Sequence, residues 1–172
     1  MKLHRGAVLA CLLLGCTGEL EVAGDPSTVR GHMQFGANRY ELRHARAVRS
    51  PFDPQRLWIL LTTAELSTKD AADASRTMNL VRSGKLRGVR LQVDAAAPNA
   101  NDLQGALLLS KDESPGGEIV FGAGGQKHWE RLILSDKRML GTLRYATEAR
   151  SFSGTPAWAL ALDFNVPVPN AR

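Results

Sequence analysis

Apolar and polar residues alternate along most of the chain after residue 28, and this pattern limits what the chain can fold into. It is clearest in residues 157–166, where every second position is apolar: Trp158, Leu160, Leu162, Phe164 and Val166. Successive side chains of a β-strand point to opposite faces of its sheet, so this segment is typical of a strand with one buried face and one face in water. Pro167 and Pro169 then end the pairing, because proline has no amide hydrogen to donate.

The same alternation predicts two more half-buried strands, over residues 86–94 and 138–148. Their inward-pointing residues are Val89, Leu91, Val93, Met139, Leu143 and Tyr145. Shorter apolar segments predict strands over residues 103–110, 118–123 and 128–134. The segments between the strands are rich in glycine, proline, serine and aspartate, which favour turns.

One helix interrupts the strands, over about residues 67–83. Its end signals are Ser67 or Thr68 as the N-terminal cap, Asp70 and Asp73 in the first turns, and Arg82 and Gly84 at the C-terminal end. Its apolar stripe, at spacings of three and four residues, is Ala71, Ala74, Met78 and Val81. A stripe of small residues predicts close packing against a sheet.

The segment before the helix, residues 57–61, is apolar on both faces, as expected of a central strand that the helix covers. Central strand, helix and strand 86–94 form one possible parallel crossover. In that arrangement the sheet is mixed.

The first two strands form a hairpin whose register follows from their apolar residues. The pairs that bring these residues to one face are Phe35 with Tyr40 and Met33 with Leu42. Residues 36–39 then form the loop, and the same phase points His44 and Arg46 inward. Both are candidate residues of a pocket, although a histidine in a strand is more often a surface or hydrogen-bonded residue.

These elements predict a mainly β fold: an antiparallel or mixed β-sandwich, or a barrel-like sheet, of about eight to nine strands with one packed α-helix. One domain covers residues 29–172. Gly88, Gly105 and Gly141 lie inside strands, where they mark bulges, tight bends or room for a neighbouring indole.

The first sixteen residues have the organisation of an export signal. Lys2 and Arg5 form a positive segment, and residues 6–15 form an apolar run of about ten residues, which is too short to span a bilayer. The run ends in Leu13-Leu14-Gly15-Cys16, which resembles the lipobox of bacterial lipoproteins. The alternative is an ordinary secretory signal that is cut near Ala23.

The resemblance implies that residues 1–15 are a signal peptide and that Cys16 is acylated and becomes the mature N-terminus. Two or three acyl chains, palmitate among them, hold a protein on a membrane far more firmly than one chain. Thr17 stands where some lipoproteins carry an aspartate that retains them in the inner membrane, which favours the outer membrane, facing the periplasm or the surface. Residues 16–28 are expected to be the lipidated cysteine and a flexible tether.

Composition limits the chemistry of the mature domain. Both cysteines, Cys11 and Cys16, lie within the first sixteen residues, so the domain has no internal disulfide. Loss of Lys2 and Arg5 with the signal lowers the net charge from +5 to +3. That charge lacks the concentrated basic footprint of a dedicated nucleic-acid binder.

Catalytic and metal-binding motifs are not found. The Gly-x-Ser-x-Gly pattern of a nucleophile elbow does not occur, and His32, His44 and His128 form no His-x-x-x-His pair. Residues 122–127 lack the spacing, the Ser or Thr and the following helix of a phosphate-binding loop. We therefore expect a protein that is not an enzyme and that binds no metal or other cofactor.

The basic residues are more suggestive, since arginine binds phosphates and carboxylates through paired hydrogen bonds. They gather in the first hairpin and its exit, and around the end of the helix. The candidate anion-binding residues are Arg39, Arg43, Arg49, Arg82, Lys85, Arg87 and Arg90. The alternative is an ordinary solvated face. Nucleic acid is not expected as a partner, because the chain has no aromatic residue for base stacking between Trp58 and Phe121.

Together these features predict a lipid-anchored protein of the bacterial cell envelope that acts as a non-catalytic binding or assembly module. Its expected partners are the membrane, through lipidated Cys16, an envelope protein, and anionic lipid or lipopolysaccharide. One alternative is a carrier of an apolar ligand or lipid in a cavity near Trp129, Leu143 and Trp158. The other alternative is an envelope hydrolase without a recognisable motif.

Overall fold

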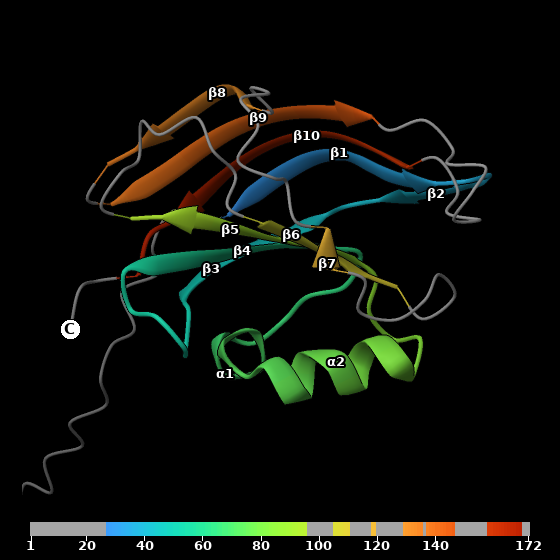
Figure 1. Ribbon diagram of the computed structural model, residues 1–172, viewed down its shortest axis with the longest axis horizontal. Coiled ribbons are helices and arrows are strands. Elements are labelled where there is room, and N and C mark those ends of the chain that lie inside the picture. Colours follow the sequence, from blue (N-terminus) through green and yellow to red (C-terminus); the bar gives the residue numbers. More distant parts are fainter. Residues whose placement is uncertain are drawn as a thin grey trace, which may run out of the picture.

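The computed structural model describes residues 27–95, 105–110, 118–119, 129–135, 137–146 and 158–169. In this part of the chain, ten strands form two sheets that stack face to face, and two helices lie against the outer face of one sheet (Figure 1). The elements are β1 (Thr28–Phe35), β2 (Asn38–Glu41), β3 (His44–Arg49), β4 (Arg56–Thr62), α1 (Thr68–Ala72), α2 (Ala74–Arg82), β5 (Gly88–Asp94), β6 (Gly105–Leu109), β7 (Glu118–Ile119), β8 (Trp129–Leu134), β9 (Arg138–Ala146) and β10 (Trp158–Pro167).

Sheet A has the strand order β2-β1-β10-β9-β8, and sheet B has the order β3-β4-β5-β6-β7. Neighbouring strands are antiparallel throughout both sheets. The expected mainly β fold is therefore confirmed as a sandwich of two open antiparallel sheets, and neither the closed barrel nor the mixed sheet is found.

The core between the sheets is built from the apolar phase of each strand. All five inward residues expected on β10 are buried, and Trp158 packs against the ring of Tyr145 with 4.7 Å between ring centroids. The inward residues predicted on β5 and β9 lie in the same core, with Tyr145 only half-buried. The period of two in the sequence thus indicated correctly which face of each long strand is buried.

A second core lies between sheet B and the helices. β4 is buried along almost its whole length, with Leu57, Ile59 and Leu61 in the inter-sheet core and Trp58 and Leu60 facing the helices. The helical stripe packs on this face as expected, through buried Ala71 and Val81 and half-buried Ala74 and Met78. The expectation of a central strand covered by a helix is confirmed.

The helical segment is two helices and not one. Asp73, between α1 and α2, has an extended backbone with φ −105° and ψ 105°, and its carboxylate accepts hydrogen bonds from the N–H groups of Ser75 and Arg76. An aspartate that caps a helix in this way competes with continuation of the helix before it. The predicted cap is confirmed at Ser67, whose hydroxyl accepts from the N–H of Asp70.

The predicted parallel crossover is wrong, because β4 and β5 are antiparallel neighbours. The two ends of the connection that carries α1 and α2 are hydrogen-bonded to each other. The N–H of Thr63 donates to the carbonyl of Arg87 (2.9 Å), and the N–H of Arg87 donates to Oγ1 of Thr63 (3.2 Å). The chain therefore re-enters sheet B at the end where it left. A parallel neighbour requires a connection that returns along the full strand length.

The register predicted for the first hairpin is wrong by two residues. The observed pairs are Met33 with Tyr40 and Phe35 with Asn38. Only Gly36 and Ala37 form the turn, and Gly36 has a φ of 55°, which a tight two-residue hairpin turn favours and glycine adopts without strain. A shift of two residues leaves every side chain on its expected face, so Met33 and Phe35 are buried as predicted.

The inward direction predicted for His44 and Arg46 is wrong. The chain leaves sheet A after β2 and enters sheet B as β3, where Ala45 and Ala47 belong to the inter-sheet core. His44 and Arg46 alternate with these alanines and so share the outer face of sheet B. The prediction carried the phase of one strand into the next and missed the change of sheet.

Two glycines stand where the backbones of neighbouring strands come very close. Gly31 has a φ of 133°, and a Cβ there would clash with the carbonyl oxygen of Ala161 on β10; a Cβ at Gly88 would clash in the same way with the carbonyl of Leu61 on β4. Gly88 therefore marks a close approach of two backbones, a role that was not among those expected for the strand glycines.

We predict that Gly31→Ala lowers the free energy of unfolding by about 1–3 kcal/mol or more. The backbone of β10 must shift to make room for the added methyl group, and the positive φ of residue 31 disfavours any side chain. Chemical denaturation measures the change. The control is Gln34→Ala on the exposed face of the same strand, with an expected change of less than about 1 kcal/mol. Equal effects of the two substitutions would contradict the close approach.

Candidate functional site

The outer face of sheet A is the candidate functional surface. The helices cover the outer face of sheet B, whereas no described helix or strand lies over the outer face of sheet A (Figure 1). Four outward residues form a row across four strands, because Arg30 on β1 pairs with Asp163 on β10, Asp163 with Thr142 on β9, and Thr142 with Arg131 on β8. This row exists only because strands from both ends of the chain are neighbours in sheet A.

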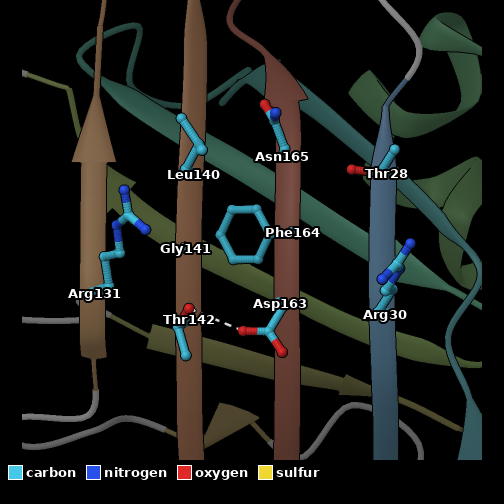
Figure 2. A pocket seen from close by; sticks show the side chains of 9 residues that line it. All are labelled: Thr28, Arg30, Arg131, Leu140, Gly141, Thr142, Asp163, Phe164 and Asn165. Carbon is cyan, nitrogen blue, oxygen red and sulfur yellow. Dashed lines mark hydrogen bonds between the residues drawn. The ribbon is translucent and has the colours of Figure 1, made fainter.

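A shallow depression of about 290 Å³ follows this row (Figure 2). Arg30 and Arg131 stand on opposite sides of it, with Thr142 and Asp163 between them. Gly141 has no side chain, and the ring of Phe164 lies beside it on the neighbouring strand. The depression combines charged walls with a partly apolar floor.

The negative charge at the centre of the row is already neutralised. Arg144 donates from Nη2 to Oδ2 of Asp163 (2.8 Å), and the hydroxyl of Thr142 donates to Oδ1 (2.9 Å). The hydrogen bond from Arg144 holds the pKa of Asp163 below its usual value, so the carboxylate is ionised at neutral pH. Arg144 also donates from Nη1 to the carbonyl of Leu162 (2.8 Å), which fixes its position.

Arg30 and Arg131 differ from Arg144. Within the described part of the chain, neither guanidinium has a hydrogen-bond or ion-pair partner, and both residues are exposed. Two unpaired guanidinium groups on the two sides of one depression, with a neutralised carboxylate between them, favour a ligand that carries phosphate or carboxylate groups. The arrangement is suited to binding and orienting such a group.

The seven residues that the sequence suggested for anion binding lie at separate places in the structure. Arg39 pairs with Glu41 (3.0 Å), and Arg49 donates to the carbonyl oxygens of Pro54 and Pro169. Arg87 lies over the ring of Tyr40 and Arg90 over the ring of Trp58, 4.0 Å from its centroid. Arg43, Arg82 and Lys85 are exposed, on the β2–β3 connection and at the end of α2. The seven residues do not form one face.

The two pocket candidates lie near α1. Arg46 donates from Nη1 to Oγ1 of Thr68 (2.8 Å) and lies 4.0 Å from a carboxylate oxygen of the exposed Glu65. His44 is half-buried on β3, opposite Thr62 of β4. Arg46 therefore ties the first turn of α1 to sheet B, which is a structural role.

Sequence reasoning missed most of the residues of the site. Neither Arg30 nor Arg131 is among the predicted anion-binding residues, and Thr142 and Asp163 belong to no predicted site. The available signal was phase: all four residues occupy the polar phase of their strands. Phase alone does not say which strands are neighbours, so the row could not be assembled without the tertiary structure.

The interior offers no support for a carrier in the part of the chain that the structure describes. Leu143 and Trp158, proposed to line a cavity, are 0% and 5% exposed and pack among other core side chains. The side chain of Trp129 lies outside the described residues, as do residues 1–26 with Cys16, and residues 122–127.

Neither a protein-family model nor a curated protein nor a solved structure matches this chain. Among the described helices, none has both the length and the apolar character needed to cross a bilayer. The described residues also contain no group of three or more His, Cys, Asp or Glu side chains arranged to hold a metal ion.

Proposed function

We propose that this protein is a lipid-anchored module of the bacterial cell envelope that binds an acidic partner on the outer face of sheet A, without catalysis. The lipobox-like segment that ends at Cys16 supports the anchor. The observation that carries the binding role is the depression between the unpaired guanidinium groups of Arg30 and Arg131. The outer membrane is the proposed location, because Thr17 follows the cysteine.

An anchored module of this kind does not need a tight binding site. A tether that holds two binding surfaces close together raises their effective concentration to the millimolar range. Two charge-assisted contacts, each about twice as strong as a neutral hydrogen bond, then suffice for a reversible complex. Arginine contacts at an exposed face contribute to the rate of encounter and to specificity more than to affinity.

Site-specific photocrosslinking tests the binding role. A benzophenone amino acid replaces Ile133, which is 42% exposed on β8 and pairs with Leu140 at the edge of the depression. We predict crosslinked products in intact cells from this position. The double variant Arg30→Glu, Arg131→Glu should reduce their yield about tenfold or more, because it replaces two attractive charges with two repulsive ones.

The matched control reverses two charges elsewhere. Arg82→Glu together with Lys85→Glu makes the same change in net charge at exposed positions near the end of α2, and it should leave the crosslinks unchanged. In isolated membranes, about 1 M salt should weaken the crosslinks, since the Debye length falls from about 10 Å to about 3 Å. Crosslinks that survive the reversal at Arg30 and Arg131, or that respond equally to both reversals, would refute this surface as the binding site.

A further inference from the structure

The loop between β3 and β4 presents an aromatic ring to solvent. Phe52 is 79% exposed, by far the largest exposure of a bulky apolar residue among the described residues. Both prolines of the same loop, Pro51 and Pro54, are also exposed. Single apolar residues on a surface are common and by themselves need no explanation. The conformation of this loop and its place on the molecule distinguish Phe52 from such a residue.

The loop is held rigidly. The N–H of Phe52 donates to Oγ of Ser50, and the N–H of Gln55 donates to Oδ1 of Asp53. Arg49 donates to the carbonyl of Pro54 (2.8 Å), and the N–H of Ala95 at the end of β5 donates to the carbonyl of Gln55 (2.8 Å). A loop with this many hydrogen bonds presents its ring at little cost in conformational entropy on binding.

The charge of the loop suits an apolar environment. Its one acidic residue, Asp53, is paired with Arg56 at 2.9 Å. Lys137 is exposed in the β8–β9 turn, and its carbonyl accepts from the N–H of Val168 just beyond β10 (2.8 Å), so this lysine lies at the end of the sandwich where β10 ends. An exposed aromatic ring, a neutralised acid and a lysine at the same end of a domain are features found where proteins meet the interfacial region of a bilayer.

The loop lies at the end of the sandwich from which the N-terminal segment leaves. Thr28, the first residue of β1, pairs with Asn165 near the end of β10. Arg49, the last residue of β3 before the loop, donates to the carbonyl of Pro169 beyond β10 (3.5 Å). The start of β1, the end of β10 and the Phe52 loop are therefore at one end of the molecule, and the β1–β2 turn is at the other end (Figure 1).

We propose that the Phe52 loop inserts its ring into the surface of the membrane to which the protein is anchored. This inference rests on the proposed lipid anchor at Cys16, because the anchor is what places this end of the domain next to lipid. The twelve residues from 17 to 28 can span at most about 40 Å. At the millimolar effective concentration that such a tether provides, the burial of one phenylalanine ring is enough to orient the domain.

The test measures protection of a thiol beside Phe52. The mature lipidated chain has no free thiol, since Cys11 lies in the signal and Cys16 carries the lipid. Gln55→Cys places a single thiol in the loop at an exposed position. Ala37→Cys, also exposed, places the matched thiol in the turn at the opposite end. Each lipidated variant is reconstituted into vesicles of phosphatidylethanolamine and phosphatidylglycerol and treated with a membrane-impermeant maleimide.

We expect the thiol at position 55 to react about tenfold more slowly than the thiol at position 37, corrected for their rates in denatured protein. Adding Phe52→Ser to Gln55→Cys should remove the difference, and adding it to Ala37→Cys should change nothing. Equal rates at the two positions, or no effect of Phe52→Ser, in protein that floats with the vesicles would overturn the loop contact alone. Protection in native membranes but not in these vesicles would point to a protein partner and would overturn it too.

Failure of the anchor itself has a different signature. Protein that carries no acyl mass and does not float with the vesicles would overturn the lipid anchor and, with it, the membrane contact of the Phe52 loop. Flotation and labelling rate are separate readouts, so the two failures are distinguishable.

Discussion

Cys16→Ser should abolish incorporation of labelled palmitate and move the protein from the membrane fraction to the soluble fraction. Only a thiol accepts the diacylglycerol group in the lipoproteins that this N-terminus resembles, so a hydroxyl at position 16 leaves the chain without acyl chains. Each methylene group that is buried in the bilayer contributes about 0.8 kcal/mol, so two or three chains hold the protein stably on the membrane. Of the substitutions proposed, this one has the largest expected effect on location.

The chain contains its own control for this experiment. Cys11→Ser changes the other cysteine, inside the apolar run of residues 6–15, and should leave palmitate labelling and fractionation unchanged. Mass spectrometry of the N-terminal peptide supplies a second readout. An N-terminus near Ala23 without acyl mass would show that the segment is an ordinary secretory signal. Both the proposed membrane location and the proposed membrane contact of the Phe52 loop would then be wrong.

Trp158→Ala should lower the free energy of unfolding by about 3–5 kcal/mol. The indole is 5% exposed in the inter-sheet core and packs at a tilt against the ring of Tyr145, and Trp158 pairs with Phe35 across β1 and β10. Removal of the ring forfeits its transfer free energy and leaves a cavity between two sheets whose backbones are held by hydrogen bonds and cannot collapse freely. For a domain of ordinary stability this loss is a large share of the total.

Equilibrium denaturation with urea measures the effect, through the midpoint and the slope of the transition. Phe52→Ala is the matched aromatic control, because its ring is 79% exposed and its loss should change the free energy of unfolding by less than about 1 kcal/mol. Similar effects of the two substitutions would contradict the burial of Trp158. A destabilised Trp158→Ala protein that remains in the membrane fraction would also show that anchoring does not depend on the fold.

The part of the fold that the sequence predicted best is the part that local physics decides. Strand β10 alternates strictly between apolar and polar residues, and all its apolar residues are buried. Ser67 caps α1 as expected, since a short hydroxyl side chain satisfies the free N–H groups of a first helical turn. Both inferences need only a few neighbouring residues, because the signal and its cause lie in the same segment.

The errors arose where one segment had to be placed against another. A hydrophobic pattern with a period of two tolerates a shift of two residues, so the register of Met33 against Tyr40 depended on the tight turn at Gly36. The direction of β5 depended on the hydrogen bonds that join Thr63 to Arg87. Neither the turn geometry nor those bonds is written in the apolar pattern.

The sequence by itself determined that the chain is mainly β, with strands that bury one face, since the alternation and the helix caps are read within single segments; the lipobox-like segment that ends at Cys16 is likewise read within one segment, and the lipid anchor it implies stays a prediction. Only the tertiary structure decided which side chains share a surface. Arg30 and Arg131 are about a hundred residues apart in the chain and lie on opposite sides of one depression because β1 and β8 both belong to sheet A. The physical reason is that strand pairing is set by the burial of whole sheet faces, which sums contributions from distant segments, whereas the polar face that results is left free to bind.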